Sequence, residues 1–186
     1  MVALSALWLP IVLSAVIVFI ASSIFHMVLP FHRSDYKKLP DEEKVTAAIR
    51  GAGVTPGLYM FPHTDHKEMK QPAAQEKFKR GPVGTMTIRP SGPISMGPFL
   101  GQWFGYCLLV GFFTAYIAAH TLASGVHYLE VFRVVGAVSF MAYGLANVAN
   151  GIWKGEPWGM VAKEVIDGLI YGLLTAGVFG WLWPKA

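Results

Sequence analysis

The chain has 186 residues, of which 54% are hydrophobic and 14% are charged, and its mean hydropathy is +0.46. A typical soluble domain is about 45–50% apolar and about 25% charged. Residues 32–98 hold 11 of the 15 Lys and Arg side chains and 7 of the 11 Asp and Glu side chains. This uneven distribution excludes an ordinary soluble globule, a disordered chain and a nucleic-acid-binding protein. It predicts an integral membrane protein with one polar insert.

Four stretches are long and apolar enough to cross a bilayer, because a spanning helix needs about 20 largely apolar residues for about 30 Å of hydrocarbon. The first two carry no charged side chain, whereas the last two contain a few ionisable residues. The four predicted spans run approximately from Leu4 to Phe31, Pro98 to Leu122, His127 to Trp153 and Pro157 to Trp183.

These spans predict an all-α integral membrane protein, a four-transmembrane-helix bundle with a cytoplasmic insert between helices 1 and 2. Residues 1–31 are the predicted first transmembrane helix, residues 32–98 the polar insert, and residues 99–186 a three-helix transmembrane unit. The single cysteine, Cys107, excludes an intrachain disulfide and a cysteine-based metal site.

The basic side chains predict the orientation of the chain in the membrane. Arg33, Lys37 and Lys38 directly follow the first span, and loops rich in Lys and Arg stay in the cytoplasm. We therefore expect the insert in the cytoplasm and both termini outside it. The expected location is the cytoplasmic (inner) membrane of a bacterium.

The polar insert contains three short segments with recognisable patterns. Residues 41–50 follow a proline and begin with carboxylates, which is typical of a short helix. The runs 58–61 and 83–88 are bounded by Pro and Gly and are predicted to pair as a β-hairpin. We expect residues 63–80, which lie between these runs, to form a polar, mobile loop.

Ionisable and amide side chains inside the predicted spans are costly in hydrocarbon and normally face the bundle interior. Lys163 and Asp167 are spaced i,i+4, and Glu130 and Arg133 are spaced i,i+3, so each pair can meet on its own helix. The intramembrane polar candidates are Glu164, Asp167, Lys163, Asn147 and Asn150 towards the cytoplasmic side, and His120, Glu130 and Arg133 towards the outside.

Internal neutralisation is the favoured explanation for these charges. We expect Asp167 or Glu164 to face helix 3 and to form a hydrogen bond with an asparagine, Tyr143 or Lys163, since desolvation disfavours an unpaired carboxylate.

The sequence identifies no catalytic, cofactor-binding or metal-binding residues, and any cofactor is unknown. His63 and His66 have a His-x-x-His spacing, but zinc sites need three or four ligands on a rigid scaffold. A solvated loop is the favoured interpretation of this pair. A nucleophile elbow, a Walker loop and a dinucleotide-binding glycine pattern are all missing from the sequence.

The last two helices and their connection carry a pattern that resembles a known family. Residues 147–158 form a polar turn, residues 166–171 contain Asp-x-x-x-Tyr, and residues 177–183 form a glycine-rich tail that ends in Trp. This pattern resembles small uncharacterised bacterial integral membrane proteins classified only as a domain of unknown function. The resemblance covers residues 99–183 and implies the fold, but it implies no activity, and the long insert departs from the family's compact form.

Three functions remain open from the sequence. The favoured one is a non-enzymatic membrane protein, a homo-oligomer or an accessory subunit of a membrane complex, because small residues such as Gly168 and Gly172 indicate close helix packing. Its expected partners are the lipid bilayer and other membrane chains, and no nucleic acid. The first alternative is a small proton, ion or solute transporter that uses Glu164 and Asp167. The second is a membrane enzyme that acts on a lipid or quinone through His120, His127 and Glu130.

Overall fold

The computed structural model describes residues 2–185, and the chain is mostly helical. It divides into two compact units. The helical unit consists of residues 2–35, 95–151 and 156–185, and the insert unit consists of residues 36–94 and 152–155. The predicted division into membrane helices and a polar insert therefore has a structural counterpart, but the helical unit extends to residue 35 and not to residue 31.

The first helix of the helical unit is α-helical in its middle and has other helix types at its two ends. A 3₁₀ turn at Leu4–Leu7 leads into α1 (Trp8–Ser23), which continues as a π-helical segment at Ile24–Val28. Leu29 is extended, and a second 3₁₀ turn follows at Pro30–His32. Proline suits the first position of such a turn because it has no N–H to leave unsatisfied there.

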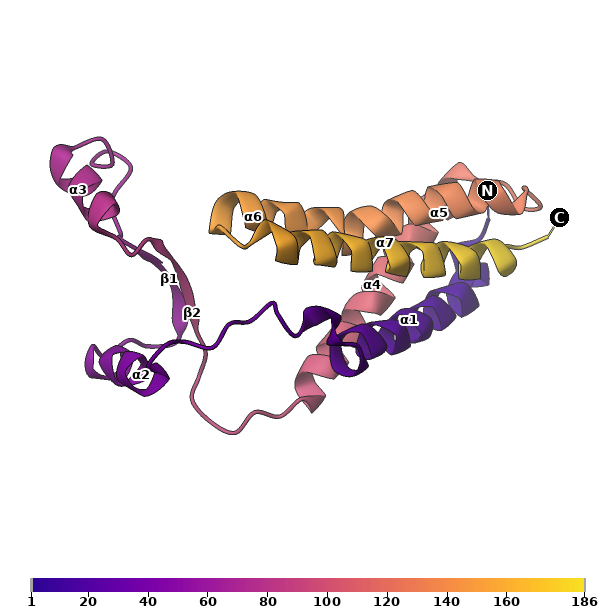
Figure 1. Cartoon of the computed structure of the whole chain (residues 1–186). Coiled ribbons are helices and arrows are strands. Elements are labelled where there is room, and N and C mark those ends of the chain that lie inside the picture. Colours follow the sequence, from indigo (N-terminus) through magenta and orange to yellow (C-terminus); the bar gives the residue numbers. More distant parts are fainter. Residues whose placement is uncertain (1, 186) are drawn as a thin grey trace. The chain divides into compact units, whose positions relative to one another are not determined.

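The remaining helices of this unit follow the insert. They are α4 (Gly97–Thr121), α5 (Tyr128–Tyr143), a 3₁₀ turn (Leu145–Asn147), α6 (Val148–Lys154) and α7 (Trp158–Trp181). The last three residues of α6 belong to the insert unit. Figure 1 shows α5 and α7 side by side, and α1 packs against both α4 and α7. The buried core centres on Leu7, Ala115, Val131 and Phe179 in one cluster, and on Val18, Cys107, Tyr143 and Tyr171 in another.

Three helices in the described part of the chain are long and apolar enough to cross a membrane: Leu4–Val28, Gly97–Thr121 and Tyr128–Lys154. They correspond to the first three predicted spans. A helix also forms at the fourth predicted span, but α7 is not among these three, and it carries Lys163, Glu164 and Asp167. The prediction of a mostly helical membrane protein is thus supported by three helices of sufficient length and hydropathy.

Glycines allow α5 and α7 to approach each other closely. A Cβ atom added to Gly168 would lie less than 3.0 Å from backbone atoms of Gly144 and Tyr143. A Cβ atom added to Gly172 would lie 3.1 Å from the backbone nitrogen of Phe140. The small-residue spacing on α7 therefore serves packing within this chain, as small residues do between membrane helices.

The insert unit contains α2 (Glu42–Gly51), β1 (Gly57–Phe61), α3 (Pro72–Arg80) and β2 (Gly84–Ile88). The strands are antiparallel, with Gly57 opposite Ile88 and Phe61 opposite Gly84. The predicted helix near residues 41–50 and the predicted hairpin are both confirmed. The expectation of a loop throughout residues 63–80 is wrong, because α3 begins at a proline and continues with residues of good helix propensity.

Candidate metal centre

The site begins where α1 ends. His26 lies in the π-helical segment and His32 in the 3₁₀ turn after Pro30. The extended Leu29 between them turns the chain back, so the two imidazole rings stack with centroids 4.1 Å apart and an interplanar angle of 24°. Single π-helical turns are rare and occur frequently at functional sites, and this one places two ring nitrogens on the same side.

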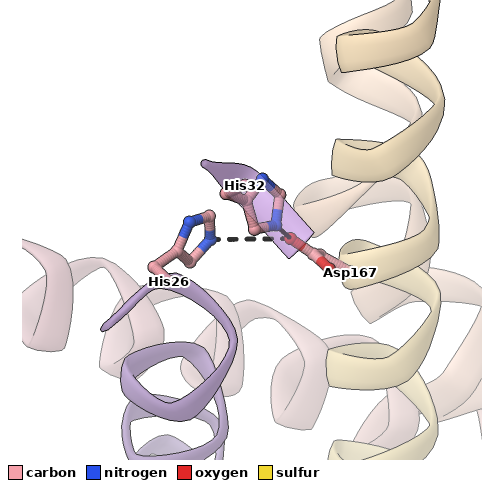
Figure 2. A group of neighbouring side chains, drawn as sticks. All are labelled: His26, His32 and Asp167. Atoms are coloured by element: carbon pink, nitrogen blue, oxygen red, sulfur yellow. Dashed lines mark hydrogen bonds and ion pairs between the residues drawn. The ribbon is translucent and has the colours of Figure 1, made fainter. Parts of the chain in front are cut away.

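Asp167 of α7 faces both rings (Figure 2). Its Oδ2 atom lies 2.8 Å from His32 Nε2 and 3.5 Å from His26 Nε2. The three side chains each offer one ligand atom, and these atoms all lie within 4.8 Å of one another. Asp167 is only 3% exposed, whereas the side chain of His26 is 50% exposed. One side of the cluster is therefore buried and the other is open.

Asp35 accepts a hydrogen bond from the second ring nitrogen of His32. His32 Nδ1 lies 2.6 Å from Asp35 Oδ2, so Nδ1–H donates to the carboxylate. The second oxygen, Asp35 Oδ1, lies 2.6 Å from Lys163 Nζ. Burial raises the pKa of the Asp35 carboxyl, but the hydrogen bonds from Lys163 and His32 outweigh burial and keep this pKa below its usual range. Asp35 is thus an ionised acceptor for both neighbours.

Lys163 fixes the turn that carries His32 and Asp35. Besides Asp35, its ammonium group donates to the backbone oxygen of Phe31 at 2.7 Å and to Ser34 Oγ at 2.9 Å. It also lies 5.3 Å from the centre of the Phe31 ring. These contacts fasten residues 31–35 to α7, the helix that supplies Asp167, so α7 sets the position of the His32 ring.

Three buried polar atoms of α7 make no hydrogen bond within the described residues. They are Glu164 Oε2, Asp167 Oδ1 and, one helical turn beyond Asp167, the hydroxyl oxygen of Tyr171. Buried polar groups are nearly always paired, and an unpaired one needs an explanation such as a bound ion, ligand or water. The cluster therefore retains capacity for a further group.

The donor set matches that of a site for a divalent transition metal. Two imidazole nitrogens with one carboxylate occur in catalytic zinc sites and in non-haem iron(II) sites. Histidine ligands of metals usually donate their other ring N–H to a carboxylate or carbonyl, which fixes the tautomer. His32 makes this contact with Asp35, so His26, His32 and Asp167 could hold the ion, with Asp35 and Lys163 as the supporting pair.

The candidates predicted on the cytoplasmic side are partly brought together. Asp167 and Lys163 both belong to the cluster, but the expected pair between them is wrong, since Lys163 bonds to Asp35. The expectation that Asp167 bonds to helix 3 or to Lys163 is also wrong, because its partners are His32 and His26.

The remaining candidates on this side form no hydrogen bond with the cluster, although Glu164 is close enough to interact electrostatically with Asp35, His32 and Asp167. Asn147 donates to the backbone oxygen of Tyr143 on its own segment. Asn150 and Glu164 are partly buried on α6 and α7, and among residues 2–185 no hydrogen bond joins either side chain to the cluster.

The candidates predicted on the outer side do not form a site. His120 Nδ1 lies 2.7 Å from the backbone oxygen of Tyr116, and His127 caps α5 by accepting from the Leu129 amide. Glu130 and Arg133 are exposed, and no ion pair joins them in the part of the chain that the structure describes.

Sequence reasoning missed His32 and Asp35. Both lie just beyond the predicted end of the first span and were assigned to the insert. The signal that could have found them is His-x₅-His-x₂-Asp from His26 to Asp35, at the end of an apolar helix.

Searches against protein-family models, curated proteins and solved structures found no match to this chain. The resemblance to a bacterial family of unknown function therefore stays a prediction.

Proposed function

We propose that the chain is an integral membrane protein that binds a divalent transition-metal ion through His26, His32 and Asp167. The observation that carries the proposal is the state of two ligands. His32 is held by Asp35 through the ring nitrogen that faces away from the cluster, and Oδ2 of the buried Asp167 faces the Nε2 atoms of both histidines. Three protein ligands leave at least one coordination position open, as in catalytic zinc sites.

The proposed topology has four spanning helices in the inner membrane of a bacterium, with both termini outside and residues 32–98 in the cytoplasm. Its weakest member by composition is α7, which carries Lys163, Glu164 and Asp167. Lys163 is neutralised by Asp35, and Asp167 lies against His32 and His26. Pairing reduces the cost of ionisable groups in a membrane, which supports α7 as the fourth span.

Equilibrium binding of Zn²⁺ to the purified protein, prepared without a polyhistidine tag, tests the metal site. We expect one Zn²⁺ per chain after treatment with a chelator and dialysis. His32→Ala and Asp167→Asn should each abolish this binding, since two remaining ligands do not hold the ion. Asp35→Asn should weaken it by about 10–100-fold, the usual effect of removing a group that orients a ligand.

Matched controls use the histidines outside the cluster. His120→Ala and the double variant His63→Ala/His66→Ala should bind Zn²⁺ as the unaltered protein does. Substitution of Co²⁺ should give visible absorption bands that disappear in His32→Ala. Unchanged stoichiometry in His32→Ala and Asp167→Asn, or loss of binding in His63→Ala/His66→Ala, would refute the proposed site.

The functions favoured by the sequence stay predictions. The small-residue spacing of α7, which favoured an oligomer or an accessory subunit, packs against α5 within the chain, so it gives no separate support for a partner. The transporter alternative gains one observation, since Asp167 lies in a cation-binding donor set, but Glu164 stands outside that set. The metal site is compatible with either function.

A further inference from the structure

An apolar pocket with a volume of about 380 Å³ lies directly beside the candidate metal centre. The π-helical segment and the turn after it contribute Phe25, Leu29, Pro30 and Phe31, and α7 contributes Ile166 and Ile170. Asp167 is the one charged side chain among the described residues that line it. The volume lies within the usual range for small-molecule sites, which combine apolar walls with a few placed polar groups.

The carboxylate in this wall keeps one unpaired oxygen atom, which is buried beneath the pocket surface. Asp167 is 3% exposed, and its Oδ1 atom has no hydrogen-bond partner within residues 2–185. A buried acceptor without a donor costs roughly 1–3 kcal/mol. A hydroxyl group that enters the pocket would supply the missing donor, and a carboxylate head group would be repelled by Asp167 unless the ion screened it.

The apolar surface continues along α7 beyond the pocket. A second hollow of about 490 Å³ shares Ile170 with the first and is lined further along by Ile17, Leu173, Leu174 and Trp181. From Ile166 to Trp181, α7 rises about 22 Å at about 1.5 Å per residue. This length suits an extended hydrocarbon chain that lies parallel to the membrane helices.

The open side of the pocket faces away from the protein core. Leu29 and Phe31 are each 39% exposed and Ile166 is 48% exposed, although all three are large apolar residues. In the proposed topology these side chains meet lipid near the cytoplasmic interface. A ligand that is itself a lipid can therefore reach Asp167 from the bilayer without crossing water.

We propose that the site takes a single-chain amphiphile with a neutral hydroxyl head group. The hydrocarbon chain lies in the apolar hollows along α7, and the hydroxyl donates to Asp167. The proposal deepens the proposed function and rests on it only in that Asp167 serves both groups. Oδ2, which faces His32 and His26, is the ligand of the ion, and Oδ1 accepts from the hydroxyl. A straight-chain alcohol and an isoprenoid alcohol share this chemistry, and both belong in the test.

Photo-crosslinking in detergent micelles with diazirine-labelled long-chain probes tests the proposal. The probes are a straight-chain alcohol, an isoprenoid alcohol, the corresponding fatty acid and an alkane without a head group, all added to the zinc-loaded protein. We expect one or both alcohols to label the peptide that contains residues 166–170 more strongly than the alkane does. The stronger of the two alcohols identifies the class of chain.

Two substitutions fill the pocket and one serves as a matched control. Ile170→Trp and Ile166→Trp should lower labelling by the alcohols about tenfold or more, since hydrophobic pockets discriminate by shape at this level. Leu169→Trp adds the same ring at a 44% exposed neighbour that lines neither hollow, and it should leave labelling unchanged. All three variants should keep the Zn²⁺ stoichiometry of the unaltered protein, which also shows that they fold.

Two results would refute the proposal that the pocket binds this amphiphile. One is equal labelling by the alkane, which would mean that ordinary lipid fills the hollows. The other is undiminished labelling of both pocket-filling variants. Failure of the metal site can be distinguished from failure of the lipid site. If the protein binds no Zn²⁺ but labelling still depends on Ile170, the metal site is refuted and the lipid site is supported.

Discussion

Replacing Lys163 by methionine is expected to lower the free energy of unfolding of the helical unit by more than the loss of a single hydrogen bond would. The Lys163 ammonium group donates to Phe31, Ser34 and Asp35 at 2.6–2.9 Å. Its side chain is 20% exposed and that of Asp35 is 6% exposed. Methionine keeps the length and the apolar stem but removes all three contacts, so the Asp35 carboxylate stays buried with His32 as its remaining partner.

Loss of one member of a buried ion pair typically costs about 3–5 kcal/mol, against about 0–1 kcal/mol for an exposed pair. The partial exposure of Lys163 places the expected loss near the lower end of the first range, at about 3 kcal/mol. Asn147→Ala provides the comparison. The amide of Asn147 donates to the backbone oxygen of Tyr143 within its own segment, and even hydrogen bonds between membrane helices average only about 0.6 kcal/mol.

Unfolding of the purified protein by sodium dodecyl sulfate in mixed micelles gives these free energies. A double-mutant cycle with Asp35→Asn isolates the pair, because Lys163→Met should harm the Asp35→Asn protein much less than it harms the unaltered one. A loss for Lys163→Met no larger than that for Asn147→Ala, with no coupling to Asp35, would refute the reasoning. It would mean that the lysine extends to the interface and that the turn does not depend on it.

Three further predictions concern packing, topology and the insert. Gly168→Ala should cost about 1–3 kcal/mol or more by forcing α7 away from Gly144, whereas Gly159→Ala, with open space around its Cβ position, should be neutral or slightly stabilising in the same unfolding assay. A cysteine at Ser91 should resist impermeant thiol reagents added to intact cells, whereas one at Ser124 should react; the reverse pattern would invert the topology. Backbone amides of β1 and β2 should exchange hydrogen more slowly than those of the loop before α3, and equal rates would contradict the hairpin.

Hydropathy and turn chemistry predicted most of the fold because both depend on neighbouring residues. The predicted second span, Pro98 to Leu122, differs by one residue at each end from α4 (Gly97–Thr121). The hairpin followed from two apolar runs bounded by Pro and Gly. The division of the third span into α5, a 3₁₀ turn and α6 was not predicted. It occurs at Gly144, whose backbone lies so close to Gly168 of α7 that a side chain at position 168 would not fit.

The candidate site could be predicted only in part. Residue spacing placed Lys163 and Asp167 in one polar layer, and both belong to the observed cluster, because spacing along a helix is regular. Their partners could not be found in this way. His32 and Asp35 lie in a turn whose path depends on the π-helical segment and on Pro30, and no periodic pattern encodes a chain that folds back on its own helix.

The contacts of α7 also explain how two of its three Lys, Glu and Asp side chains fit in the proposed membrane bundle. Lys163 and Asp167 each find their partners in residues 26–35. The partners precede them by more than 120 residues in the sequence. In this topology the first helix inserts by its own hydropathy, whereas α7 gains its neutralising groups only when it packs beside the turn that follows that helix. Insertion of α7 and assembly of the His26, His32 and Asp167 cluster are therefore one event, so a change that loosens the turn should weaken both together.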